Sequence, residues 1–463
     1  MMSAVPVLHA QGFGLNEIGT CAVARGQAAT GAPCTDPSVI YWNPAALISL
    51  QHWSIYAGAA AIGVRGRFIA DTTRHSYALD APADVPPHLF LSYGGHRWAA
   101  GLGAYVPYGL SIGWPSDFPG RFAAQRAQLT SIYVQPTIAI QLTPGNWSVG
   151  GGPVFGRSSA ELVEAVDLAT VPVPFSVAGL PPGVSFGALG IRPGTAFARA
   201  RLKGSATAWG FNVGIHGHIT PVLQVGARYL SAMRFRYEDA RATFGQISTG
   251  LIIPAAIPTP LGTLPAGTQL DALLASEFAP GGALVPQRVT TTIENPAQLA
   301  VGVGYSGLRH ARLSVDYVWF GWSVFDRLPL NFQGPAAAES RTIEEQYHDS
   351  WALRSGGEYR LANGWVARAG FSYAPSPVPD QSVAPLLPDM NRYNISAGIG
   401  VPIGGRYTMD AAYLHVGTTG RRGRIADRRL VPPNALVLTS IPPAAGFYEL
   451  SADVVSLSVR ARF

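Results

Sequence analysis

The chain has 463 residues, of which 48% are hydrophobic and only 13% are charged, and its formal net charge is +6. Soluble domains usually carry about 25% charged residues, so this composition disfavours a protein whose whole surface faces water. Apart from one dense run at 421–429, the arginines are scattered singly along the chain, which argues against a nucleic-acid partner. No uninterrupted run of about 18 apolar residues predicts a transmembrane helix.

The first ten residues, MMSAVPVLHA, end in a small residue before a glycine-rich segment. This pattern is typical of the last part of a secretory signal, with cleavage expected after Ala10. A basic start and a full apolar stretch are missing. Residues 1–10 are therefore interpreted as a signal-peptide remnant, unless the true start lies upstream.

Residues 11–50 lack strand alternation and are rich in glycine, alanine and proline-containing breaks. One interpretation is a disordered arm. The other is a compact plug, or hatch, folded inside a larger structure. Apolar anchors such as Ile18, Val39, Trp42 and Leu47 favour the hatch, because a disordered arm would lack them.

Two cysteines, Cys21 and Cys34, both fall within this segment. Too few soft ligands surround them for a metal site. In an oxidising compartment they would form a disulfide, and otherwise they would be two free buried thiols.

The rest of the chain alternates apolar and polar residues with the period of a β-strand. In the last ten residues, VVSLSVRARF, one face carries Val455, Leu457, Val459, Ala461 and Phe463, and the other carries serines and arginines. A soluble β-sandwich would show the same alternation, so this pattern alone does not decide the fold.

The connections between the strands discriminate better. Tight turns near 94–97, 143–146, 219–221, 307–310, 361–364 and 403–406 alternate with long segments rich in proline and glycine. Outer-membrane barrels have this arrangement, with short periplasmic turns and long outer loops. The sequence therefore predicts an all-β protein: a transmembrane antiparallel β-barrel of about 14 strands over residues 51–463. Its last strand should close against the first, near 52–66, with the hatch in the lumen.

The third predicted strand, WAAGLGAYVPYG, contains Gly101, Gly103 and Pro107. Glycine permits a bend and proline cannot donate to the ladder, so this strand is the candidate for a kink with a lateral opening in the wall. The alternative is that these are ordinary residues at a strand end.

Two long loops, 166–192 and 251–278, are very apolar for outside loops. In the second, one face of a short helix is predicted for Leu270, Leu273, Leu274 and Phe278. The loops either form a surface that captures hydrophobic ligands or pack on each other. The basic run 421–429 is interpreted as a solvated loop or a lipopolysaccharide contact.

Several segments resemble the FadL/TodX family of outer-membrane transporters. GFGLNE at 12–17, ARGQAATG at 24–31 and DPSVIYWNPAAL at 36–47 are similar to the family's N-terminal hatch. Within them, Phe13, Asn16, Glu17, Asn43 and Pro44 are the expected hatch residues. Segments 105–139, 314–328, 349–383 and 388–400 are similar to its outer loop and wall strands, and the terminal Phe463 fits the end of an outer-membrane protein.

The resemblance implies passive transport of hydrophobic compounds, most often long-chain fatty acids, with lateral exit into the membrane. An aromatic-hydrocarbon channel of the same fold is the alternative, and a general diffusion porin is a further one. For a fatty acid, Arg157 is the candidate for the carboxylate headgroup. The expected setting is the bacterial outer membrane, with its lipid and lipopolysaccharide as partners, a monomeric protein and no cofactor. No nucleophile motif such as GxSxG or HExxH is present, so an enzyme is not expected.

Overall fold

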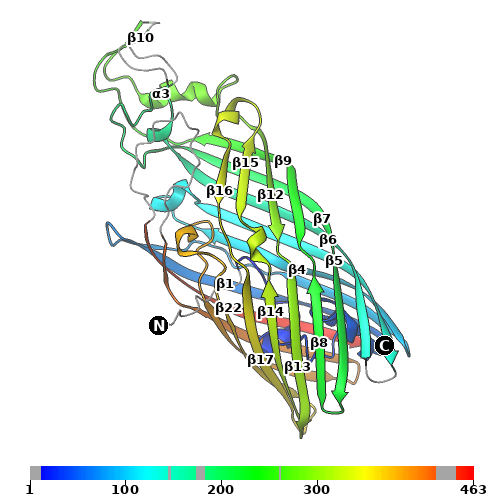
Figure 1. Cartoon of the computed structure of the whole chain (residues 1–463). Helices are drawn as coiled ribbons and strands as arrows, with labels where there is room; N and C mark the ends of the chain where they lie inside the picture. Colours follow the sequence, from blue (N-terminus) through cyan, green and yellow to red (C-terminus); the bar gives the residue numbers. More distant parts are fainter. Residues whose placement is uncertain (1–11, 144–146, 174–182, 260–261, 424–444) are drawn as a thin grey trace, which may run out of the picture.

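The computed structural model describes residues 12–143, 147–173, 183–259, 262–423 and 445–463. The predicted signal remnant at 1–10 lies outside the described residues. The chain forms a closed antiparallel barrel of 14 strands (Figure 1), which confirms the predicted fold class and strand number.

The wall is built in chain order, and each strand pairs with its sequence neighbour. Its first half comprises β1 (His52–Ala70), β3 (Pro87–Gly94), β4 (Trp98–Gly113), β5 (Arg126–Thr143), β6 (Trp147–Asp167), β7 (Ala196–Thr220), and β8 (Leu223–Leu230) continued by β9 (Met233–Gln246). Its second half comprises β12 (Gln287–Asn295) continued by β13 (Gln298–Leu308), β14 (Ala311–Phe320), β17 (Ser350–Arg360), β18 (Val366–Ala374), β19 (Arg392–Ile403), β20 (Tyr407–Thr418) and β22 (Gly446–Arg462). Short strands decorate the loops: β2 (Ser76–Ala78), β10 (Ile257–Thr259), β11 (Gly262–Leu264), β15 (Arg327–Phe332), β16 (Arg341–Glu344) and β21 (Arg421–Gly423).

The first and last strands close the barrel. β1 pairs with β22 in one unbroken register, from Ser54 opposite Arg462 to Ala70 opposite Gly446. The closure removes the exposed edge that a terminal strand would otherwise present. On β22 the alternation follows the prediction, because Leu457 is 59% exposed on the outside while Ser456 and Ser458 are buried inside.

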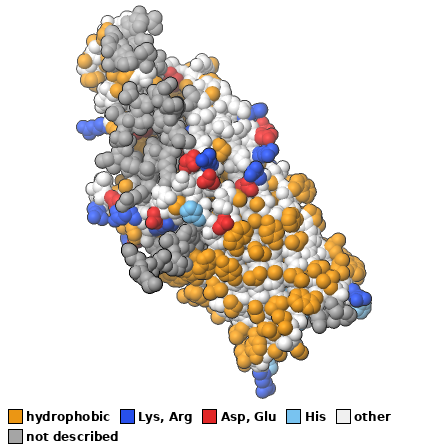
Figure 2. Space-filling view, viewed as in Figure 1, with side chains coloured by type: hydrophobic (Ala, Val, Ile, Leu, Met, Phe, Trp, Pro, Cys, Tyr) orange, Lys and Arg blue, Asp and Glu red, His pale blue; other side chains and the backbone are white. Residues whose placement is uncertain are grey.

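A band of apolar side chains crosses the face of the wall that is seen in Figure 2. Ile138 and Leu457 are each 59% exposed and Trp209 is 70% exposed. Such large apolar exposure suits lipid rather than water. Beyond the band, the longest strands, β6 and β7, carry charged side chains on the same face, so the wall continues above the hydrocarbon region.

The hatch lies inside the barrel, near the short turns, where the dark-blue helices appear through the wall in Figure 1. It contains α1 (Thr20–Ala24), α2 (Val39–Trp42) and a 3-10 helix at Pro44–Ser49. At the opposite end the loops include α3 (Leu270–Leu274), followed by a 3-10 turn at Ala275–Phe278. None of the helices in the described part of the chain has both the length and the apolarity to cross a membrane.

Candidate transport route

The hatch is held to the wall by buried polar side chains of the strands. Asp316 on β14 accepts hydrogen bonds from the backbone N–H groups of Thr30 at 2.6 Å and Gly31 at 3.0 Å. Arg354 on β17 donates to Asn16 Oδ1 at 3.0 Å. Because most of its side chains are buried and several are hydrogen-bonded to the wall, the hatch is a packed segment rather than a disordered arm.

The hatch backbone touches the wall backbone directly. A Cβ placed on Gly31 would lie 2.2 Å from the carbonyl carbon of Gly302 on β13. Only glycine permits this approach, so small residues at 24–31 fit the hatch against the wall.

The predicted hatch residues lie in two groups. Asn43 caps the 3-10 helix, since its Oδ1 accepts the N–H of Ala45 at 3.2 Å, and Pro44 occupies the first helical turn. Asn43 Nδ2 also donates to the carbonyl of Ile215 on the wall at 3.1 Å. Burial raises the pKa of the Glu17 carboxyl, although the Asn16 N–H donates to it at 2.9 Å and acts in the other direction.

Cys21 and Cys34 form a disulfide, with their Cα atoms 6.3 Å apart. The sequence allowed either a disulfide or two free buried thiols, and the structure has the disulfide. It closes the segment that carries Arg25, whose guanidinium donates to Ser314 of the wall at 2.8 Å. The disulfide therefore fixes the part of the hatch that contacts β14.

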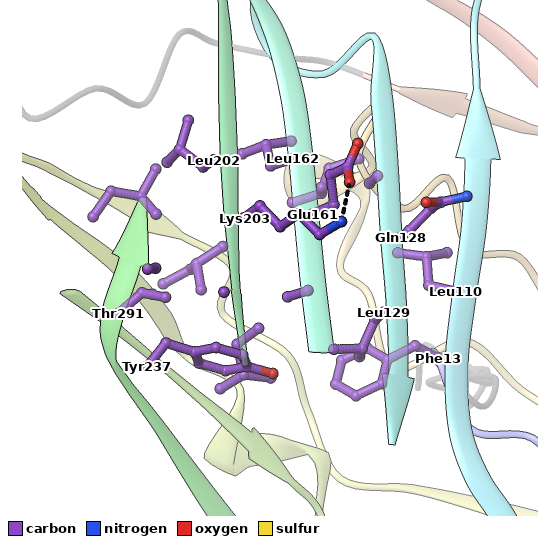
Figure 3. Close-up of a pocket in the computed structure, with 18 of the residues that line it drawn as sticks. Phe13, Leu110, Gln128, Leu129, Glu161, Leu162, Leu202, Lys203, Tyr237 and Thr291 are labelled. Carbon is purple, nitrogen blue, oxygen red and sulfur yellow. Dashed lines mark ion pairs between the residues drawn. The ribbon is translucent and has the colours of Figure 1, made fainter. Parts of the chain in front are cut away.

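Above the hatch lies an almost purely apolar cavity of about 790 Å³ (Figure 3). Phe13 of the hatch and Leu110, Leu129 and Leu202 of the wall are among its lining residues. Such a space binds an alkyl chain or an aromatic ring by excluding water from apolar surface.

A second cavity, of about 1120 Å³, lies on the other side of Phe13. The two cavities share Phe13, Leu110 and Leu387, so these three side chains form the partition between them. Phe13 is held edge-on against Trp322, with ring centroids 4.7 Å apart. A ligand moving from one cavity to the other must pass this partition.

The second cavity has a polar end that the sequence analysis missed. Arg392 borders it and donates to Asp389 at 2.7 Å and to the carbonyl of Gly12 at 3.0 Å. The signal available in the sequence was a pair of opposite charges three residues apart, Asp389 and Arg392, where β19 begins. Segment 388–400 was assigned to a wall strand by its family resemblance, and the spacing of its charges did not show that it lies beside the hatch.

The ladder between β3 and β4 continues over Gly101 and Gly103 and ends at Ala104. These two glycines therefore do not open the wall. A Cβ on Gly101 would lie 2.7 Å from Ile40 Cδ1, so the glycine instead makes room for the hatch. Gly101 and Gly103 thus lie in the paired part of the strand, and the lateral opening predicted for this strand stays a prediction for its part around Pro107.

The regular pairing of β4 with its neighbouring strands is interrupted around Pro107. The register between β4 and β5 shifts between Tyr105 and Tyr108, and on its other side β4 bonds to the hatch. The N–H of Leu15 donates to the Pro107 carbonyl, and the N–H of Gly109 donates to the Phe13 carbonyl, both at 2.9 Å. Beyond Ala104, no β3 residue in the described chain pairs with β4.

Arg157 lies on the outside of the barrel. On β6 the neighbours Val154, Gly156 and Ser158 point inward, so the strand period turns Arg157 outward. It borders an outer surface hollow and lines neither lumen cavity. Arg157 therefore does not reach either cavity, and its role as the headgroup residue stays a prediction that applies to the outer face of the wall.

The predicted short helix in the fourth outer loop is present as α3 and its 3-10 extension. Leu270 and Leu274 are 5% and 1% exposed, and both pack in a cluster with Phe186 of the neighbouring loop and Phe197 of β7. Leu273 and Phe278 are partly buried at its edge. None of the four lines a cavity described here. Packing between the loops thus accounts for Leu270 and Leu274, and a capture role stays a prediction for the other two.

Basic residues of the run 421–429 are described only as far as Gly423. Arg421 pairs with Asp380 at 2.7 Å, and Arg422 pairs with Asp71. The remaining residues of the run lie outside the described chain.

Comparisons with known proteins agree with this geometry. A family described as "Outer membrane protein transport protein (OMPP1/FadL/TodX)" matches residues 2–463. A putative outer membrane protein of Neisseria meningitidis is 26% identical over 89% of this chain and 87% of its own length. A long-chain fatty acid transport protein of Salmonella typhi is 25% identical over 85% and 86%.

Two solved structures share the fold. A FadL homologue of Pseudomonas aeruginosa superposes with a TM-score of 0.77 at 19% identity, covering 98% of this chain and 100% of its own. The toluene transporter TbuX of Ralstonia pickettii superposes with a TM-score of 0.63 at 18% identity, covering 97% and 99%.

Proposed function

Because this chain belongs to the OMPP1/FadL/TodX family of outer membrane transport proteins, we propose that the hydrophobic compound it transports is a long-chain fatty acid. Transport of hydrophobic compounds across the outer membrane is the activity of the family. The choice of fatty acid within that class is the proposal.

The observation that carries this choice is the pair of cavities in series. An apolar space of about 790 Å³ adjoins, across the partition at Phe13, a larger space that is also lined by Arg392, close to Gly12. A long alkyl chain with a polar head has the same asymmetry. Arg392 already pairs with Asp389, so a carboxylate arriving there would compete for a guanidinium that is in place.

The driving force for entry is burial of apolar surface. Each Å² of alkyl chain removed from water contributes roughly 25 cal/mol, so a long chain gains several kcal/mol from the apolar cavity. The route needs no energy source, because the alkyl chain of the ligand then passes into the membrane interior, which is as apolar as the cavity.

The proposed exit lies between β1 and β4. The second cavity is bordered by Ile62 and Val64 of β1 and by Gly109–Ile112 of β4. β1 and β4 are bridged there by the connecting residue Asp84, which pairs with Ile62, rather than by a continuous ladder. Displacement of Phe13 and Leu15 from β4 would join the cavity to the membrane.

An aromatic hydrocarbon is the second candidate. The first cavity presents almost no polar surface, which suits a ligand without a headgroup. A general diffusion porin is disfavoured, because the hatch fills the lumen where a porin keeps a water-filled channel.

Uptake by cells that lack their own hydrophobic transporters tests the proposal. We expect labelled oleate to enter faster with this protein, and Arg392→Gln to raise the KM for oleate while leaving toluene entry unchanged. Arg360→Gln, at an exposed strand end, serves as the matched control. Entry of toluene alone would assign the aromatic class instead. Entry of neither, with strong ion conductance in a planar bilayer, would contradict transport of hydrophobic compounds.

A further inference from the structure

The wall has a second interruption, between β7 and β9. Their ladder runs from Ala198 to Lys203, which stands opposite Arg241, and then stops. Pairing resumes only at Phe211, which exchanges hydrogen bonds with Ser231 at 2.9 Å before β8 takes over. Between these points, Gly204–Gly210 on β7 has no ladder partner on β9 among the described residues.

A bulge in β9 accompanies the interruption. The register between β9 and β12 shifts between Val289 and Thr291, which leaves Glu238 and Asp239 both exposed on the outside. The extra residue bends β9, as bulges do, and prevents it from following β7. We refer to Gly204–Gly210 of β7 with Arg234–Asp239 of β9 as the β7–β9 seam.

The apolar cavity reaches the seam from inside. Gly204, Tyr237 and Ala240 are among its lining residues (Figure 3). The Tyr237 side chain is 1% exposed, and its hydroxyl donates to Ser158 on β6 at 2.7 Å. Ser158 stands opposite Ala206 in the β6–β7 ladder, so the tyrosine ring lies across the inner face of β7. Tyr237 is thus the side chain that covers the seam from within.

An open polar hollow meets the seam from outside. It is lined by Ser205–Thr207 of β7, by Arg157 of β6 and by Arg234, Arg236, Glu238 and Asp239 of β9. Arg234 pairs with Glu294 at 2.7 Å, whereas Arg157 and Arg236 make no ion pair within the described chain. Asp239 pairs with Arg288 at 3.2 Å, so among the described residues the hollow holds two cations outside ion pairs against one such carboxylate, that of Glu238, and keeps a net positive charge for an anion.

The seam lies at the boundary of the apolar band. On β7, Trp209 at the lower end of the seam and Phe211 just below it are 70% and 46% exposed, and above the seam Arg201 and Lys203 are exposed. Unpaired backbone groups are tolerated at headgroup level, where water reaches them, but not in hydrocarbon. Tryptophan favours the same level. A molecule in the outer leaflet would meet the seam with its head beside the arginines and its chain toward the wall.

We propose that the β7–β9 seam is a second lateral portal, through which a fatty acid in the outer leaflet passes its alkyl chain into the apolar cavity while its carboxylate binds Arg157 and Arg236. This inference rests on the proposed function, because it supplies another entrance to the same cavity. It gives Arg157 a headgroup role at the outer mouth rather than in the lumen. Opening requires rotation of Tyr237 away from Ser158.

Photolabelling tests the portal on the full-length protein in vesicles with a lipopolysaccharide outer leaflet. The probe is a fatty acid with a diazirine near the carboxyl end and an alkyne at the chain end. Labelled peptides are mapped by mass spectrometry. A parallel sample uses lipopolysaccharide with a diazirine on one acyl chain. We expect the fatty acid to label both the seam and the apolar cavity.

Substitution of the two cations supplies the specific control. Arg157→Gln with Arg236→Gln should lower seam labelling by the fatty acid about two- to fivefold, the factor supported by a solvent-exposed ion pair. Arg199→Gln with Arg241→Gln, on exposed arginines of the same wall outside the hollow, should leave labelling unchanged. Heat-modifiable migration on gels confirms that each variant is folded.

The outcomes separate the two proposals. Labelling of the cavity without the seam overturns the portal and leaves fatty-acid transport standing. Labelling of neither overturns both. Seam labelling by lipopolysaccharide alone, independent of Arg157 and Arg236, also overturns the portal, because the hollow would then be a lipid contact.

Discussion

Asp271 shows how one side chain organises an outer loop. Its carboxylate accepts hydrogen bonds from Thr249 N–H at 3.0 Å, from Thr249 Oγ1 at 2.6 Å and from Ser248 Oγ at 2.7 Å. Although partial desolvation acts to raise the pKa of Asp271, these hydrogen bonds outweigh it and lower the pKa to about 2. The charged form is therefore preferred in the folded loop.

The pH dependence of this loop follows from the sign of that shift. A carboxyl whose pKa is lower in the folded state stabilises the fold above its unfolded pKa and loses the effect as pH falls through the folded value. We expect amide exchange at Thr249 and Gly250 to stay slow from neutral pH to about pH 4 and to accelerate toward pH 2, after correction for intrinsic rates. Asp271→Asn should exchange faster at neutral pH. Slow, unchanged exchange in that variant would contradict the anchoring role.

Single residues were also where sequence reasoning failed. Arg157 and Gly101 were assigned roles from residue type and approximate position. The strand phase turned Arg157 outward, and Gly101 proved to accommodate Ile40 of the hatch. The packing of Gly101 depends on a contact with a segment far away in the chain, which no local pattern contains. Arg392 was missed for the same reason.

At the scale of elements, the strands were predictable because each has one face in lipid and the other in a packed lumen, so period-two alternation is imposed along the wall. The short turns were equally clear. The breaks at Pro107 and at the Glu238–Asp239 bulge were less so. A bulge needs only one extra residue, and the alternation on each side of it still looks regular.

The disulfide of the hatch gives a prediction at this scale. In the chain-entropy account, a bridge that closes a loop of this size stabilises the folded segment by about 3 kcal/mol. We expect Cys21→Ser with Cys34→Ser to increase proteolysis and ion conductance through the hatch while the barrel keeps its heat-modifiable migration. The matched control is Thr20→Ser, on the same helix. Unchanged protection of residues 20–34 would show that wall contacts alone hold the hatch.

At the scale of the molecule, the barrel is a hydrophobic route with a plug rather than a pore. The hatch blocks the lumen on the short-turn side, and apolar cavities lie between it and the outer loops. The overall plan was predictable from the alternation of short and long connections together with the family likeness. The cavities were not, because their walls come from the hatch, the loops and many strands at once.

The account's central claim is that ligand leaves sideways between β1 and β4, and locking that opening tests it most directly. Asp84 and Ser111 border the second cavity from the two sides of the opening. In Asp84→Cys with Ser111→Cys, cross-linking by a short thiol reagent should reduce oleate uptake at least tenfold. Each single variant treated alike, and the wild type with its buried Cys21–Cys34 bridge, should transport normally. Full uptake by a completely cross-linked protein would contradict lateral exit through the opening between β1 and β4.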